Sequence, residues 1–148
     1  MLQPPRPILW LAPLALLVSA GCGGSGPEMI PVGGSVKFSD GTVPQGEVAV
    51  VRFEPVQPSD AGGAAGEAEI RKGASGDIRP DGSFTLTTVA PGDGVIPGRY
   101  KVCFTVLETY VGEEPLVPAQ YRNAQTTPFE VTVGPDGASQ TEFVLEKP

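Results

Sequence analysis

Histidine is absent from this 148-residue chain, which also has only two cysteines and one tryptophan. Histidine is the side chain most often used as a general base near neutral pH, and it is the commonest protein ligand of transition metals. Its absence argues against zinc-dependent hydrolysis and against Ser-His or Cys-His catalysis. The sequence therefore predicts a protein that is not an enzyme, with no catalytic residues, no bound metal and no cofactor.

Basic side chains are few as well, with 10 Lys and Arg against 17 Asp and Glu and a net charge of -7. Proteins that bind nucleic acid neutralise phosphates with a cluster of basic residues, and the sequence shows no such cluster. We therefore expect no nucleic-acid partner. The excess of acidic residues indicates a well-solvated surface.

The first 21 residues have the composition of an export signal. Residues 1–6 are weakly basic, and residues 8–18 form an apolar stretch that is too short to span a bilayer stably. Pro13, inside this stretch, argues against a permanent transmembrane helix. Residues 1–21 are therefore predicted to be a signal peptide that is cleaved before Cys22, and the protein is expected to be exported.

Ser19, Ala20 and Gly21 directly precede Cys22, and this run of small residues resembles the lipobox of bacterial lipoproteins. In that family the cysteine thiol is diacylated, the signal is cut before it, and the new amine is usually acylated. The family usually has Leu or another aliphatic residue where this chain has Ser19, so ordinary secretion with a free Cys22 thiol stays open as an alternative. The resemblance implies that Cys22 is the lipidation site.

A lipidated Cys22 would tie the protein to a membrane, since two or three acyl chains anchor a protein stably and one does so only marginally. Residues 23–28 read Gly-Gly-Ser-Gly-Pro-Glu, which is typical of a flexible tether. Glycine rather than aspartate after the cysteine resembles the outer-membrane sorting signal of enteric-type bacteria. We expect a lipoprotein of the outer membrane, the periplasm or the cell surface. Its signal is predicted at residues 1–21, its lipidated cysteine and tether at residues 22–28, and its one domain at residues 29–148.

Cys103 would then lack a partner for a disulfide within the mature chain, so the hydrophobic core must hold the fold unaided. It lies in the apolar run of residues 100–107. We interpret it as a buried, inert thiol. A nucleophilic role is the alternative, which the lack of histidine disfavours.

The part of the chain after residue 29 consists of short β-type runs separated by Gly and Pro turns, with no amphipathic helix of useful length. Two Asp-Gly turns, at residues 80–82 and 134–137, predict hairpins. We expect a further short strand at residues 67–72 and a turn of tight helix near Ala119. The main strands are predicted at residues 31–38, 47–54, 76–79, 83–88, 98–107, 129–133 and 141–145.

About seven short strands in one domain predict an all-β fold, an antiparallel β-sandwich of the immunoglobulin-like or transthyretin-like kind. Period-two alternation indicates which side chains face the core. Residues 98–107 give the clearest case. The side chains predicted to face inward are Val32, Val36, Phe38, Val48, Val50, Phe53, Tyr100, Val102, Phe104 and Val106.

The order of the motifs is similar to that of carboxypeptidase regulatory-like and transthyretin-like domains. The opening resembles theirs in Val36, Asp40-Gly41, Pro44 and Gly46, and the middle in Asp81-Gly82-Ser83-Phe84 and Pro97-Gly98-Arg99-Tyr100-Lys101-Val102. Pro118-Ala119-Gln120-Tyr121 and the terminal hairpin are similar to small bacterial lipoproteins built around such a domain. The resemblance implies a β-sandwich and no peptidase activity, because the regulatory-like domain is an accessory module.

Several side chains resemble parts of known kinds of site but have simpler interpretations. Residues 113–114, or Asp77 with Asp81, carry oxygens that suit calcium, but solvated loops and turn-forming aspartates explain them without a metal. Lys37 lies where adhesin sandwiches carry an isopeptide lysine, but the only asparagine, Asn123, is in a loop. Neither pattern is developed enough to predict a site.

The aromatic residues outside the strands do not form a sugar-stacking pattern. Trp10 leaves with the signal, and Tyr110 and Tyr121 lie in one long connection, where we expect Tyr121 to pack its loop on the sandwich with its hydroxyl satisfied at the edge.

The predicted function is a lipid-anchored, non-enzymatic cell-envelope protein with a structural or binding role, for which an envelope protein or a glycan is a candidate partner. One alternative is an extracellular carbohydrate- or peptide-binding module that uses the loops at residues 56–66 and 108–127. Another is a transthyretin-like hydrolase, but the histidines and the C-terminal Tyr-Arg-Gly-Ser-like motif of that family are missing.

Overall fold

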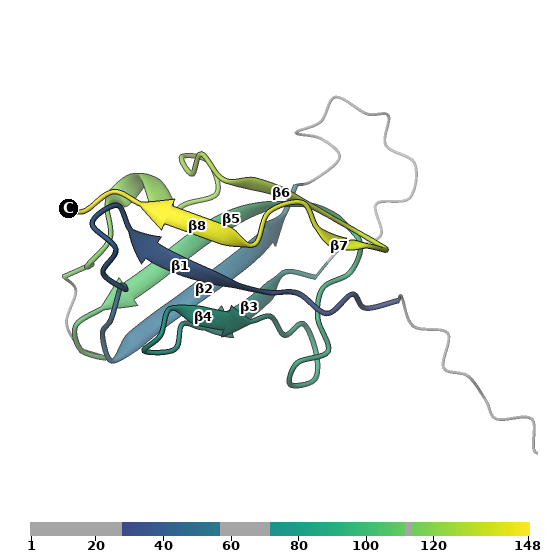
Figure 1. Cartoon of the computed structure of the whole chain (residues 1–148), viewed down its shortest axis with the longest axis horizontal. Helices are drawn as coiled ribbons and strands as arrows, with labels where there is room; N and C mark the ends of the chain where they lie inside the picture. The colour runs from purple at the N-terminus through teal and green to yellow at the C-terminus, as the bar shows by residue number, and fades with distance from the viewer. Residues whose placement is uncertain (1–27, 57–71, 112–113) are drawn as a thin grey trace, which may run out of the picture.

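The computed structural model describes residues 28–56, 72–111 and 114–148, so the predicted signal, Cys22 and most of the tether lie outside the described residues. Within these ranges the protein is all-β, as predicted. Two sheets face each other (Figure 1), and one short 3-10 helix, η2 (Ala119–Tyr121), lies near the predicted turn at Ala119. None of the described segments forms a helix long and apolar enough to cross a membrane.

The smaller sheet has three strands in the order β4-β1-β8. These strands are β4 (Ser83–Thr85), β1 (Gly33–Phe38) and β8 (Glu142–Leu145). β1 pairs antiparallel with β4 and parallel with β8. The parallel pair departs from the purely antiparallel sandwich that we predicted.

The larger sheet has five strands in the order β3-β2-β5-β6-β7, all antiparallel, and it curls like half of a barrel. Its central pair, β2 and β5, is matched over eight residues of each strand. The strands are β3 (Ala74–Asp77), β2 (Val48–Pro55), β5 (Gly98–Leu107), β6 (Glu130–Gly134) and β7 (Gly137–Ala138).

Aromatic rings fill the space between the sheets. Phe143 of β8 is 1% exposed, and its ring lies 5.3 to 6.3 Å, centroid to centroid, from four other phenylalanine rings. Three of these four contacts are edge-on, the arrangement that the aromatic quadrupole favours. The four rings belong to Phe53, Phe84, Phe104 and Phe129.

The facing predicted for residues 98–107 is confirmed. Tyr100, Val102, Phe104 and Val106 are fully buried in the core. Cys103 lies on the opposite face of β5 and is also fully buried. The burial predicted for Cys103 is therefore confirmed, although its thiol is outside the main core.

The facing predicted for β2 is wrong at two positions. Val51 and Phe53 are buried and Ala49 packs against the core, whereas Val48 and Val50 are half-buried on the other face. The run from 48 to 51 is apolar throughout, so alternation could not select one register. Phe53 was assigned correctly because its neighbours, Arg52 and Glu54, are charged.

The turn of the predicted C-terminal hairpin is confirmed, but the predicted pairing of its two strands is wrong. Gly137, with φ of 111°, begins β7, and β6 pairs with this two-residue strand. The chain then crosses to the other sheet, where β8 lies beside β1. Phe143 and Leu145 are thereby buried from the side of the smaller sheet.

The two strands of the hairpin predicted around residues 80–82 also belong to different sheets. The turn is confirmed, since the N–H of Arg79 donates to the Ser83 carbonyl over 2.8 Å and Gly82 has φ of 85°. However, β3 pairs with β2, and β4 pairs with β1. The strand predicted at residues 67–72 lies outside the described residues except for Lys72, which is not in a strand.

Candidate functional site

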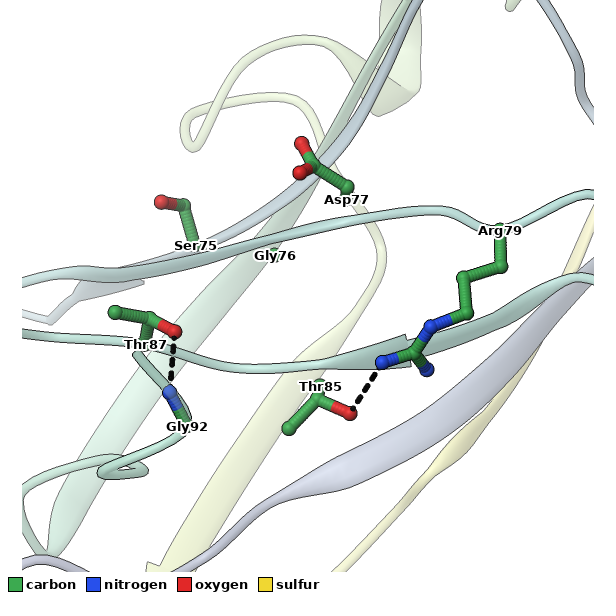
Figure 2. A pocket seen from close by; sticks show the side chains of 7 residues that line it. All are labelled: Ser75, Gly76, Asp77, Arg79, Thr85, Thr87 and Gly92. Carbon is green, nitrogen blue, oxygen red and sulfur yellow. Dashed lines mark hydrogen bonds between the residues drawn. The ribbon is translucent and has the colours of Figure 1, made fainter. Parts of the chain in front are cut away.

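A polar cleft opens where β3 and β4 diverge toward different sheets. One end is closed by the antiparallel bridge between Ser75 and Thr87, and the other by the hydrogen bond from Arg79 to Ser83. The space between them is about 550 Å³ and is open to solvent (Figure 2). It is lined by Ser75, Gly76, Asp77, Arg79, Thr85, Thr87 and Gly92.

Gly76 allows the two strands to approach each other in this cleft. A Cβ atom at this position would lie only 2.3 Å from the Thr85 carbonyl oxygen and 3.0 Å from its carbonyl carbon. Every other residue type would push the strands apart at this point. The backbones of Gly76 and Thr85 are therefore close together at this point, and polar side chains surround them.

Arg79 connects the two walls. Its side chain leaves the chain just after β3, and Figure 2 shows it reaching across to Thr85. Its guanidinium group donates to the hydroxyl oxygens of Thr85 and Ser83, each over 3.3 Å. Across the described part of the chain, neither Arg79 nor Asp77 forms an ion pair within 4 Å, and the Asp77 carboxylate accepts no hydrogen bond.

The loop after Thr87 is held by a single carboxylate. Asp93 accepts the backbone N–H groups of residues 88–90 over 2.8 to 2.9 Å. The hydrogen bond from Thr88, followed by that from Ala90, lowers the pKa of Asp93 below its usual value. Gly92, with φ of 73°, donates its N–H to the Thr87 hydroxyl over 2.9 Å, which fixes the orientation of that side chain.

The described lining of the cleft is mainly polar. It offers one cation, one anion and three hydroxyl groups, with no aromatic side chain. Among the described residues, no group of three or more His, Cys, Asp or Glu is placed to hold a metal ion.

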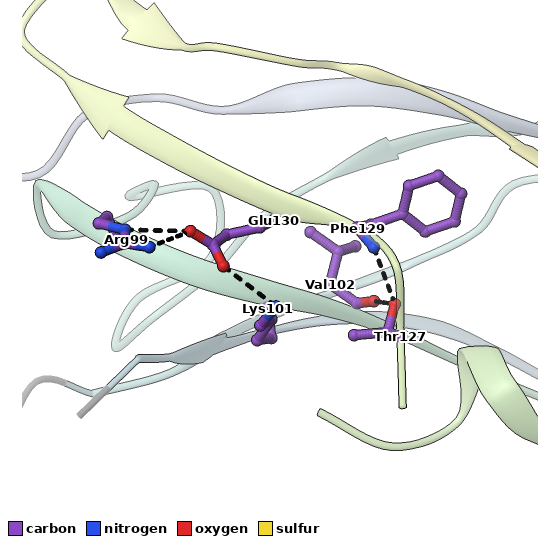
Figure 3. A network of polar contacts seen from close by, with 6 residues as sticks. All are labelled: Arg99, Lys101, Val102, Thr127, Phe129 and Glu130. Atoms are coloured by element: carbon purple, nitrogen blue, oxygen red, sulfur yellow. Dashed lines mark hydrogen bonds and ion pairs between the residues drawn. The ribbon is translucent and has the colours of Figure 1, made fainter. Parts of the chain in front are cut away.

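A second polar cluster joins β5 to β6 on the outer face of the larger sheet (Figure 3). Glu130 accepts from Arg99 through one oxygen and pairs with the Lys101 ammonium over 3.0 Å through the other. Arg99, and then Lys101, hold the pKa of Glu130 below its usual range. Both cations lie on β5 and pair with the one carboxylate on β6, so this cluster links the two strands.

Thr127 anchors the long connection before β6 onto β5, as Figure 3 also shows. It is 5% exposed; its hydroxyl donates to the Val102 carbonyl over 2.6 Å and accepts from the Phe129 N–H over 3.3 Å. A buried hydroxyl with both roles filled contributes to the fold and leaves nothing free for a ligand.

Cys103 is not a reactive thiol. Burial, and then the charge of nearby Glu54, raise the pKa of Cys103 to about 11, so its thiolate is rare at neutral pH. Its sulfur is not in a disulfide. The interpretation of Cys103 as inert is thus supported by its surroundings.

Several other predicted positions have structural roles. Asp81 accepts from the N–H and hydroxyl of Ser83, over 2.9 and 2.6 Å, which confirms it as a turn-forming residue. Tyr121 is buried, its ring stacks on Phe129, and its hydroxyl accepts the Glu146 N–H over 3.2 Å, as expected for a residue that packs its loop. Tyr110 is 78% exposed.

The remaining candidate positions do not come together. Glu113, like Cys22, lies outside the described residues, and Glu114 is exposed. Lys37 is exposed on β1 opposite Val144, while Asn123 caps its own loop by accepting the Gln125 N–H.

Sequence reasoning missed the cleft itself. Asp77 was considered only as a calcium ligand, and Ser75, Arg79, Thr85 and Thr87 were not singled out. The one available signal was glycine at position 76, the first residue of a predicted strand, because glycine in a strand often marks a close approach of backbones.

Searches among known protein families, curated proteins and solved structures find no match to this chain. The two-sheet β fold therefore rests on the structure alone. The likeness to carboxypeptidase regulatory-like and transthyretin-like domains stays a prediction from the sequence motifs.

Proposed function

We propose that this chain is a lipid-anchored, non-enzymatic protein of the bacterial cell envelope, in which the β-sandwich is a structural or binding module. The observation that carries the proposal is Cys22, which follows an apolar stretch and three small residues. Diacylation of its thiol and acylation of its amine would supply the two or more chains that stable anchoring requires.

The buried state of Cys103 supports Cys22 as the attachment site. Cys103 is fully buried in the larger sheet and its pKa is raised by burial, so an acyl-transfer enzyme has no access to its thiol in the folded domain. Cys22 is the only other cysteine of the chain. A single thiol is therefore left for modification.

The position of the first described residue supports a tethered arrangement. In Figure 1 the chain that leads into β1 enters the domain at the end opposite η2. Seven residues from 22 to 28 reach at most about 25 Å when fully extended. An anchor at Cys22 would hold the domain close to the lipid surface by this end.

The cleft between β3 and β4 favours a binding role over that of a spacer. The cleft is a solvent-open space of about 550 Å³, and the Asp77 carboxylate in its wall has no ion-pair partner among the described residues, so it is available to a ligand. The volume is in the range of small-molecule sites, although its polar lining is unusual for them.

Metabolic labelling with an alkyne fatty acid in a bacterial host tests the anchor. We expect the wild-type chain to be labelled and to partition into detergent, and the Cys22→Ser variant to do neither. Cys103→Ser is the matched control and should behave like the wild type. Labelling of Cys22→Ser at the wild-type level would overturn the proposal.

A further inference from the structure

We propose that the cleft between β3 and β4 binds a neutral, polyhydroxylated ligand, namely a sugar unit of a glycan. This inference goes beyond the membrane anchoring proposed above and does not depend on it. It rests on the kind of polar groups in the cleft, on their charge balance and on how firmly they are held.

The polar groups of the cleft match the dual character of sugar hydroxyls, each of which donates and accepts a hydrogen bond. Asp77 offers only acceptors and the Arg79 guanidinium offers only donors, while the hydroxyl groups of Ser75, Thr85 and Thr87 offer both. The several hydroxyls of a sugar can therefore donate to the carboxylate and accept from the guanidinium. Arg79 retains donors for this purpose, because its guanidinium carries five N–H groups and its contacts to the Ser83 and Thr85 hydroxyls use two of them.

The charge balance disfavours an anion in this place. The described residues that line the cleft include one cation and one anion, so their charges balance, and the chain as a whole carries a net charge of -7. A carboxylate or phosphate would gain from Arg79 but would lie beside Asp77 and within the field of an acidic protein. A neutral ligand is free of this repulsion and can use both charged groups.

The walls are organised before any ligand arrives. Gly76 sets the spacing of the strands, and Gly92 orients the Thr87 hydroxyl. Asp93 fixes the loop beside it through three backbone hydrogen bonds. Groups that are already ordered lose little entropy on binding, which favours recognition of a small, flexible polar molecule.

The lining also indicates the strength of binding. The seven residues include no aromatic platform, and the cleft is open to water. Because burial of apolar surface supplies most of the affinity in small-molecule sites, a wholly polar cleft is expected to bind a single sugar with a Kd in the millimolar range.

NMR titration of the full-length chain in detergent, labelled with nitrogen-15, tests the proposal. The probes are glucose, mannose, N-acetylglucosamine and their β-1,4-linked dimers, with acetate, inorganic phosphate and N-acetylglycinamide as rivals. We expect at least one saccharide to give saturable shifts in the amides of Gly76, Thr85, Thr87 and Gly92. The rivals should give none at the same concentration.

Two variants test the polar pair. Asp77→Asn and Arg79→Gln should each weaken saccharide binding at least about fivefold, because each replaces a charged partner of the sugar hydroxyls with a neutral one that has fewer acceptors or donors. The matched controls, Asp136→Asn and Arg122→Gln, change exposed residues outside the cleft and should bind as the wild type does. The amide spectrum of each variant reports whether the domain is still folded.

Three results would overturn the proposal. The first is the absence of a saturable shift with every saccharide. The second is tighter binding of phosphate, acetate or the peptide amide in the same cleft. The third is saccharide binding that both variants leave unchanged. None of these results bears on the labelling of Cys22, so failure here is distinguishable from failure of the anchor.

Discussion

The two sheets meet in two contrasting ways. On the side of β8, Phe143 lies among four other phenylalanine rings and is 1% exposed. On the side of β3 and β4, the sheets approach through backbone at Gly76 and are lined by hydroxyls and two charged side chains. The junction at β8 is buried and apolar, whereas the junction at β3 and β4 is polar and open to solvent.

The aromatic junction contributes mainly to stability, whereas the polar junction is suited to recognition of a ligand. Rings packed between sheets remove a large apolar area from water, which is the main source of folding free energy. Hydroxyl and charged groups at an open edge contribute little to that free energy, but they remain available to a ligand. Substitutions at the two junctions should therefore affect different measurements.

Replacing Phe143 by Ala should have the largest effect, because it removes the ring shared by both sheets. We expect the free energy of unfolding to fall by about 3 to 5 kcal/mol, measured by urea denaturation. Val144→Ala is the control, since Val144 is 48% exposed, and it should cost at most about 1 kcal/mol. Equal effects of the two substitutions would contradict the central role of Phe143.

Gly76→Ala should strain the polar junction between β3 and β4. The new methyl group would meet the Thr85 carbonyl at 2.3 Å, so one strand must shift, at a cost of about 1 to 3 kcal/mol. Gly134→Ala in β6 is the control, because a Cβ there has no neighbour within 4 Å. If thermal melting showed both variants equally stable, the close approach of β3 and β4 would be wrong.

Acid should weaken the loop beside the cleft before it affects the aromatic core. The pKa of Asp93 is lowered in the folded state, so its carboxylate stabilises the fold above the model-compound value of 3.8, and this contribution is lost as the pH falls through the lower, folded-state pKa. Asp93→Asn should therefore be less stable than the wild type at pH 7, and its stability should depend less on pH below about pH 4. Urea melts between pH 2 and pH 7 would show this, and Asp136→Asn should follow the wild-type curve.

Asp77→Asn should have the smallest effect on stability, because its carboxylate accepts no hydrogen bond within the described residues. We expect the free energy of unfolding to change by at most about 0.5 kcal/mol. A larger loss in urea melts would mean that the polar junction also holds the sheets together.

The sequence predicted best where charge or polarity alternates regularly with apolar residues. The strand from Gly98 to Leu107 was predicted with its full length and its facing, because Lys101 and Thr105 separate its core residues. In β2 the apolar run at 48–51 fits both registers, so Val48 and Val50 were placed on the wrong face.

The cleft was beyond a local reading of the sequence. The Asp81-Gly82 turn predicts a hairpin, and the turn is present. Whether the two arms stay paired depends on β1 and β2, which lie tens of residues away and each bind one arm. Local patterns specify turns, whereas the partition of strands between sheets is a property of the whole fold.

The parallel pairing of β1 with β8 has a consequence for the order of folding. Val36 of the first strand pairs with Phe143 of the last, so the smaller sheet closes only when these distant segments meet. Contacts between residues so far apart in sequence form slowly, because the intervening chain must first lose its freedom. A ribosome delivers the N-terminal segments first. The chain therefore emerges with its central aromatic cluster incomplete, and that delay would suit the export proposed above, in which the polypeptide crosses a membrane before it folds.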